Sequence, residues 1–98
     1  MKKNKKIRFG LLGLGTVVRL RVFNLFKKEI KNAKVVSVFD SDKFKTLDYS
    51  RKFNCKFNKN RKIFFLSNFD VCYISTPSGS HYKDILECFK YDKHVVVE

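Results

Sequence analysis

Short apolar runs of strand length alternate with stretches of helical periodicity along this chain. The first run spans 7–12, and the second, 34–39, is rich in β-branched residues. Further strands are expected at 71–74 and 95–97, with a weaker one at 55–57. Strands that alternate with helices form a parallel sheet with right-handed crossovers, so the pattern predicts a doubly wound α/β fold.

Two amphipathic helices are expected in the first half of the chain. Apolar residues recur every four positions from 18 to 30, as Val18, Val22, Phe26 and Ile30, with Leu25 beside them. The segment 42–52 has a helical pattern in which Phe44 and Leu47 can face inward. The first half is therefore expected to run strand, helix, strand, helix.

The second half is less regular before its last helix. The segment 58–68 holds an apolar cluster, but it is too short and too polar to predict more than one or two helical turns. A further helix is expected after 78–80, and it carries the apolar residues Ile85, Leu86 and Phe89. The strand at 95–97 is expected to close the chain with an exposed edge and an apolar face.

Length and composition fit one folded domain. A chain of 98 residues buries only roughly 60–70% of the surface that its unfolded form exposes. The hydrophobic share of 44% and the aromatic share of 15% argue against a disordered chain. The net charge of +13 also suits a small basic nucleic-acid-binding module, but apart from four Lys in the first six residues the cations are dispersed. We therefore keep that module as an alternative and expect solvated basic surfaces.

The amino terminus imitates a secretory signal, because a Lys-rich stretch precedes ten uncharged residues at 9–18. Arg19-Leu20-Arg21 follows where a signal would carry a small-residue cleavage site. No run approaches the ~20 apolar residues that span a membrane. We expect a soluble cytoplasmic protein.

The cysteines and histidines indicate neither a disulfide framework nor a metal site. Cysteines are odd in number and form no C-x-x-C pair, so free thiols that are at least partly buried are expected at Cys55, Cys72 and Cys88. His81 and His94 stand in no ligand spacing, so no metal is expected.

A glycine-rich turn follows the first predicted strand and precedes the first predicted helix. Gly13 allows a tight turn, and Gly15 lets a pyrophosphate approach the bare backbone at the start of the helix. The third position of this G-x-G-x-x-G pattern, normally Gly or Ala, is Val18, which requires a wider gap between helix and sheet. The turn thus predicts a dinucleotide-binding site on a modified motif.

An acid, Asp40, ends the second strand, 22 residues after Val18. A carboxylate there accepts hydrogen bonds from the adenosine ribose and repels a 2′-phosphate, so NAD is favoured over NADP. Lys43 and Lys45 lie close enough to weaken this preference. The alternative role for Asp40 is to cap the following helix, although Ser41 or Asp42 could cap it equally well.

The second candidate segment is 75–81, at the carboxyl end of the fourth predicted strand. Ligands of open α/β sheets lie at this edge, beside the first strand. Pro77 would stiffen the loop, and Thr76 and Ser78 could bond to a cofactor ribose or pyrophosphate. The alternative is an ordinary strand-to-helix turn with Ser80 as N-cap, in which His81 is a surface residue.

Together with 93–98, Lys-His-Val-Val-Val-Glu, these segments resemble the amino-terminal half of the Gfo/Idh/MocA family, named after glucose-fructose oxidoreductase and inositol dehydrogenase. The resemblance implies a Rossmann-type sheet of about five strands in the order 3-2-1-4-5. It implies pyrophosphate contacts from Gly13, Gly15, Thr16 and Val17, and a ribose contact from Asp40. It also implies that Glu98, the first residue of the family's Glu-Lys-Pro signature, belongs to the cofactor site, with the nicotinamide half lined by Thr76, Pro77, Ser78 and His81.

Members of the family that this chain resembles oxidise or reduce sugars, cyclitols and sugar derivatives with NAD or NADP. The Thr-Pro-Ser-Gly form of 76–79 is similar to that of members acting on nucleotide-linked N-acetylated uronic acids. The resemblance implies that 1–98 is the first part of a dinucleotide-binding domain, without the lysine after Glu98 and without the substrate domain. We therefore expect no catalytic residue, weak NAD binding, no turnover, and a sugar-type substrate only in a full-length form. A fragment with no independent function is a third hypothesis.

Overall fold

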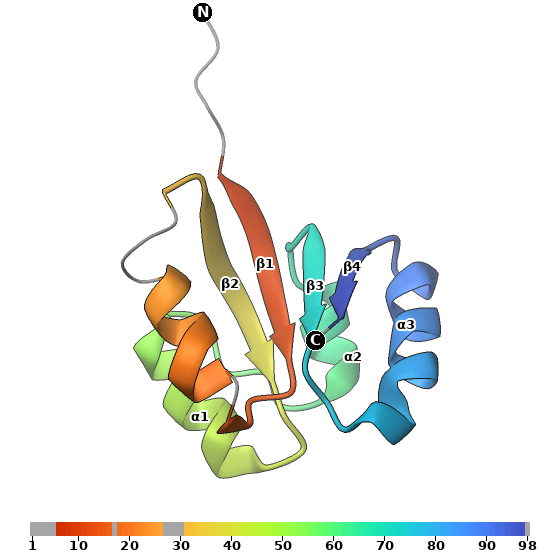
Figure 1. The fold of residues 1–98 in the computed structure, drawn as a ribbon, viewed down its shortest axis with the longest axis horizontal. Helices are drawn as coiled ribbons and strands as arrows, with labels where there is room; N and C mark the ends of the chain where they lie inside the picture. Colours follow the sequence, from red (N-terminus) through yellow and green to blue (C-terminus); the bar gives the residue numbers. More distant parts are fainter. Residues whose placement is uncertain (1–5, 17, 27–30, 98) are drawn as a thin grey trace, which may run out of the picture.

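The computed structural model describes residues 6–16, 18–26 and 31–97. Val17 and Glu98, two of the predicted cofactor ligands, lie outside this part of the chain. The strands are β1 (Ile7–Leu12), β2 (Ala33–Phe39), β3 (Val71–Ile74) and β4 (His94–Val97). They pair in parallel in the order β2-β1-β3-β4 (Figure 1).

Helices cover both faces of this sheet. On one face lie η1 (Val18–Val22) and α1 (Lys43–Lys52), and on the other α2 (Arg61–Leu66) and α3 (His81–Lys90), the latter entered through the 3₁₀ turn η3 (Ser78–Ser80) (Figure 1). The predicted doubly wound α/β fold is confirmed, with the four observed strands in their predicted relative order.

The segment 55–57, predicted as a weak strand, has no strand structure. The chain leaves α1 through Asn54, whose φ is 58°. The buried Asn58 then donates from Nδ2 to the carbonyl of Val38, 2.8 Å away, and to Ser37 Oγ, also 2.8 Å away. The amide of Asn58 thus bonds a carbonyl of β2 that a further strand could have bonded. As a result, β2 is an edge strand of the sheet.

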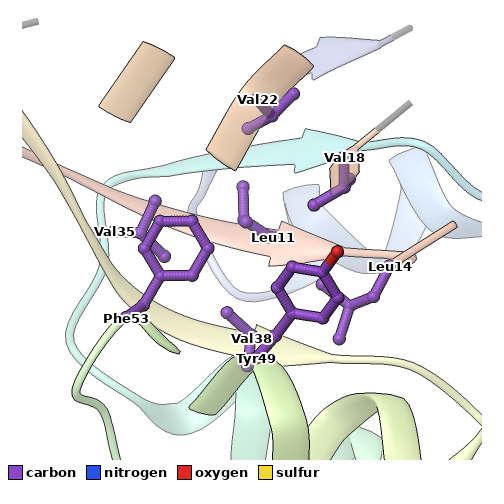
Figure 2. Close-up of a cluster of buried hydrophobic side chains, with 8 residues drawn as sticks. All are labelled: Leu11, Leu14, Val18, Val22, Val35, Val38, Tyr49 and Phe53. Carbon is purple, nitrogen blue, oxygen red and sulfur yellow. The ribbon is translucent and has the colours of Figure 1, made fainter. Parts of the chain in front are cut away.

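The core beneath η1 and α1 contains the residues drawn in Figure 2, namely Leu11, Leu14, Val18, Val22, Val35, Val38, Tyr49 and Phe53. η1 has the wider winding of a π-helix rather than the predicted α-helical winding, yet it buries Val18 and Val22 as expected. Leu25, predicted beside this stripe, is 42% exposed, and Ile30 lies outside the described residues.

The predicted inner face of α1 is wrong at Phe44, which is 80% exposed. Asp42 caps the helix by accepting from the N–H groups of Phe44 and Lys45. With the helix begun at that point, its buried side chains are Thr46, Tyr49 and Ser50, and Thr46 is further held by accepting from the N–H of Asp40.

The core on the other face contains Leu12, Phe64, Phe65, Phe69, Cys72, Ile74 and Cys88. Gly10 faces the ring of Phe69, and a Cβ at Gly10 would lie 2.8 Å from that ring. On α3, Asp84 and Cys88 are buried and Ile85 packs half-buried against this core, whereas Leu86 and Phe89 are 49% and 60% exposed. The single short helix α2 agrees with the one or two turns expected between 58 and 68.

All three cysteines are free thiols, as predicted, with Cys72 and Cys88 buried and Cys55 half-buried. Burial raises the pKa of Cys55 to about 11, so its thiol stays protonated at neutral pH. The predicted exposed edge is present at β4, where Val96 and Val97 are 43% and 40% exposed. Among the described helices, none is long and apolar enough to cross a bilayer.

Candidate functional site

The glycine-rich turn lies where β1 ends, at the carboxyl edge of the sheet. Gly13 has a φ of +95°, and its N–H donates to the carbonyl of Phe39 at 2.9 Å. A Cβ at Gly13 would lie 2.8 Å from the carbonyl carbon of Ser75 and from the nitrogen of Thr76. Only glycine fits this position, because both the left-handed backbone and the contact with the next loop exclude a side chain.

Gly15 differs from Gly13, because a Cβ added there would meet nothing within 4 Å. The carbonyl of Gly15 already accepts from the N–H of Arg19 at 3.1 Å, so the chain enters helical structure directly after the turn. The side chain of Thr16, the next predicted ligand, is exposed. Bare backbone at Gly15 therefore faces open space, as the approach of a phosphate requires.

Asp40 lies against this turn. Its Oδ2 accepts from the N–H of Leu14 at 2.8 Å, and its Oδ1 accepts from the N–H of Asp42 at 2.7 Å. The capping role considered for Asp40 is wrong, since Asp42 caps α1. The turn, predicted to bind the pyrophosphate, and the acid, predicted to bind the adenosine ribose, are thus joined by a hydrogen bond. The remaining lone pairs of the carboxylate are available to hydroxyl donors.

The loop after β3 contacts the glycine-rich turn directly. The N–H of Ser75 donates to the carbonyl of Leu12 at 2.9 Å, and Ser75 Oγ donates to the carbonyl of Gly13 at 2.8 Å. The side chain of Ser80 makes no capping hydrogen bond at the start of α3, contrary to the capping alternative. The loop is instead fixed by Thr76, whose carbonyl lies 2.7 Å from His81 Nε2.

A charged network that the sequence analysis did not anticipate supports this loop. Asp84 is only 3% exposed, and it accepts from Thr76 Oγ1 at 2.5 Å and from Arg61 Nη2 at 2.8 Å. Arg61 also donates to Glu87 Oε1, at 2.5 Å from Nη2 and 3.0 Å from Nε. Burial of Arg61 disfavours its charge, but the hydrogen bonds to Glu87 and Asp84 outweigh burial and raise its pKa.

A signal for this network was present in the sequence. Asp84 stands four residues before Cys88, so both side chains share one face of the helix. A carboxylate on the inner face of a helix needs a cationic partner. Arg61 could not be chosen in advance among 22 Lys and Arg, because α2 and α3 meet only in the folded chain.

Turn, acid and loop enclose one cleft of about 660 Å³. Of the predicted ligands, it is lined by Gly13, Gly15, Asp40, Thr76 and Pro77. Thr16, Ser78 and His81 are described but do not line it. Lys45, expected near Asp40, also lines the cleft, and Arg61 and Asp84 are charged groups there that the sequence did not predict. The cleft lies within the size range of small-molecule and cofactor sites.

Bare glycine backbone and an acid at the carboxyl edge of a parallel sheet define a nucleotide-binding α/β domain of Rossmann type. Residues 7–98 match the family model GFO_IDH_MocA, described as an oxidoreductase family with an NAD-binding Rossmann fold. The chain therefore belongs to the Gfo/Idh/MocA family, as its NAD-binding domain. A comparison with curated protein sequences gives no match.

Solved structures support the same fold. The WlbA dehydrogenase from Chromobacterium violaceum, in complex with NADH and UDP-GlcNAcA, is 24% identical, with a TM-score of 0.87 over 98% of this chain and 28% of its own. The WlbA dehydrogenase from Bordetella pertussis is 23% identical, with a TM-score of 0.85 over 95% of this chain and 28% of its own. KijD10 is a 3-ketoreductase from Actinomadura kijaniata in complex with NADP and TDP-benzene. It is 17% identical, with a TM-score of 0.85 over 95% of this chain and 29% of its own. The chain thus spans less than a third of each of these proteins.

Proposed function

We propose that this protein binds NAD in the cleft at the carboxyl edge of its sheet. The observation that carries the proposal is the hydrogen bond of 2.8 Å between Asp40 Oδ2 and the N–H of Leu14. It joins the bare backbone that suits a pyrophosphate to the carboxylate that suits a ribose. The open space beside Gly15 fits this cofactor, since a Cβ there would occupy the approach of a phosphate.

We propose NAD rather than NADP as the cofactor. The carboxylate of Asp40 would repel a 2′-phosphate and would accept from a free 2′-hydroxyl. Lys45 lines the same cleft, and Lys43 lines a smaller cavity of about 290 Å³ that also contains Asp40. These cations weaken the discrimination between NAD and NADP, but the carboxylate of Asp40 remains the hydrogen-bond acceptor. We therefore expect NAD to bind a few fold more tightly rather than NADP to be excluded.

In a full-length protein, we propose, the domain serves an oxidoreductase that acts on a sugar or a sugar nucleotide. Family membership supports the reaction class, and the similar structures include complexes with UDP-GlcNAcA and with TDP-benzene. Hydride transfer requires two carbons held about 3–3.5 Å apart with water excluded. Residues 1–98 alone are therefore expected to bind cofactor without turnover.

We also propose a cytoplasmic location, because the free thiols of the protein suit a reducing compartment.

Calorimetric titration of the purified protein with NAD and with NADP tests the proposal. We expect saturable NAD binding below about 1 mM, equivalent to roughly 4 kcal/mol. Gly15→Val should remove the binding, because its side chain fills the phosphate approach while the surroundings leave room for it. Absence of saturation with both nucleotides would refute the cofactor site.

The same preparation distinguishes the basic nucleic-acid-binding module. Binding of a DNA or RNA duplex that falls steeply with salt, and that Gly15→Val leaves unchanged, would favour that alternative. Dehydrogenase activity of 1–98 on any sugar would refute the proposed lack of turnover.

A further inference from the structure

The hydroxyl of Thr76 has one proton, and the structure accounts for it. Thr76 Oγ1 lies 2.5 Å from Asp84 Oδ2. The other oxygen of that carboxylate forms a salt bridge of 2.8 Å with Arg61. An ionised carboxylate only accepts hydrogen bonds, so the hydroxyl of Thr76 must be the donor in this pair. What remains on Thr76 Oγ1 is its acceptor capacity.

This direction is held by groups that cannot reverse it. Arg61 carries donors only, and it is bound to both Asp84 and Glu87. The carboxylate of Asp84 is almost fully buried, so losing Arg61 would leave a desolvated charge without a cation. The chain from Arg61 through Asp84 to Thr76 therefore fixes the orientation of one hydroxyl, and all three residues line the cleft.

We propose that Thr76 Oγ1 accepts a hydrogen bond from the bound dinucleotide, and that Arg61 and Asp84 are positioning residues that impose this direction. The partner on the ligand must be a donor. Since the adenosine ribose is assigned to Asp40, the donor is either a hydroxyl of the other ribose or the amide N–H₂ of the nicotinamide. A pyrophosphate oxygen is excluded as the partner, because it only accepts. This inference rests on the proposed function, since the ligand is the dinucleotide, and it narrows the sequence prediction that Thr76 binds either ribose or pyrophosphate.

The first test compares NAD, ADP-ribose and ADP on the wild type, Thr76→Val and Thr76→Ser. One neutral hydrogen bond changes affinity about 3- to 10-fold. We expect Thr76→Val to lose that factor for NAD, Thr76→Ser to stay within about 2-fold of the wild type, and ADP to bind both variants equally. A loss shared by ADP-ribose identifies a ribose hydroxyl, and a loss confined to NAD identifies the amide. Tyr82→Phe, which removes an exposed hydroxyl of α3 outside the cleft, is the control variant.

The second test uses Asp84→Asn to reverse the hydrogen bond. Arg61 needs an acceptor, so the amide oxygen stays with Arg61 and the amide N–H₂ faces Thr76. Thr76 Oγ1 then accepts from the amide of residue 84, and the hydroxyl proton of Thr76 points into the cleft. A donor group of the ligand would meet this proton instead of an acceptor. We expect Asp84→Asn to lower NAD affinity about as much as Thr76→Val does, and to have no further effect when Thr76 is already Val.

Each result decides the proposal. Equal NAD affinity of Thr76→Val and the wild type overturns it, and so does an equal loss for ADP. Additive losses in the double variant would mean that Asp84 acts on the fold rather than through Thr76, and thermal unfolding of each variant checks this reading. A wild type that binds no NAD refutes the proposed function itself, which is a different outcome from a wild type that binds NAD regardless of residue 76.

Discussion

The two halves of the cleft present different kinds of chemical group, main-chain groups in one and side chains in the other. The turn half, formed by Gly13, Leu14, Gly15 and Asp40, offers main-chain groups held by one carboxylate. The loop half, formed by Arg61, Thr76 and Asp84, offers side chains held by a buried ion pair. The structure of the turn half therefore depends on the absence of side chains, whereas that of the loop half depends on side chains that are paired by charge and hydrogen bonds. Substitutions should damage the two halves in different ways.

The largest effect is expected in the turn half at Gly13. Gly13→Ala combines a left-handed backbone, which costs about 1–2 kcal/mol for other residues, with a collision against the backbone of Ser75 and Thr76. We expect a total loss of about 3 kcal/mol in the free energy of unfolding, measured by urea denaturation. Gly15→Ala is the matched control and should change stability by less than about 1 kcal/mol. Equal losses at the two glycines would contradict the assigned geometry.

In the loop half, Arg61→Met should cost about 2 kcal/mol of folding stability. The substitution leaves the carboxylate of Asp84 buried with no cation, and the figure is below that of a fully buried pair because the Arg61 side chain is 39% exposed. The double variant Arg61→Met/Asp84→Leu removes both charges and should recover at least half of the loss. If the double variant is less stable than Arg61→Met, the ion pair is not the source of the effect.

Asp40→Asn tests whether one carboxylate serves both as a latch on the turn and as a cofactor ligand. An Asn oxygen can keep one of the two backbone N–H donors, so we expect a stability loss of only about 1 kcal/mol. Loss of the charge should bring the affinities for NAD and NADP closer together. Asp40→Ala should lose more stability than Asp40→Asn, and calorimetric titration alongside thermal unfolding separates the two roles.

The smallest effect is expected at the exposed ion pair between Arg8 and Asp70, which lie 2.9 Å apart far from the cleft. The hydrogen bond from Arg8 lowers the pKa of Asp70. The stabilisation is therefore present above the usual Asp pKa and is lost as pH falls through the lowered value in the folded protein. Arg8→Met should lower Tm at pH 7 only slightly, because exposed pairs contribute little, and the difference from the wild type should disappear as pH falls below about 4. A large change in Tm at neutral pH would mean that exposed and buried pairs contribute alike.

The same contrast explains what the sequence could predict. The turn half was predictable, because Gly13, Gly15 and Asp40 stand at a spacing that reflects local chain geometry. The loop half was not, because the salt bridge joins positions 61 and 84 across two helices. Periodicity also failed at Phe44, which is 80% exposed, whereas the buried residues of α1 are Thr46, Tyr49 and Ser50.

The missing strand at 55–57 has a similar cause. The apolar residues there suggested a strand, but the side chain of Asn58 bonds the carbonyl of Val38 and the hydroxyl of Ser37 on β2 instead. A long-range side-chain contact of this kind leaves no periodic trace in the sequence.

The contact between Gly13 and the backbone of Ser75 and Thr76 also limits how the protein can respond to a ligand. The two stretches touch without an intervening side chain and share the hydrogen bond from Ser75 Oγ, so neither can hinge away from the other without breaking that bond. The glycine-rich turn and the loop after β3 should therefore behave as one rigid unit beneath a bound molecule. Adjustment to different occupants is left to side chains such as Lys45, because the ion pairs with Asp84 and Glu87 hold Arg61 in place.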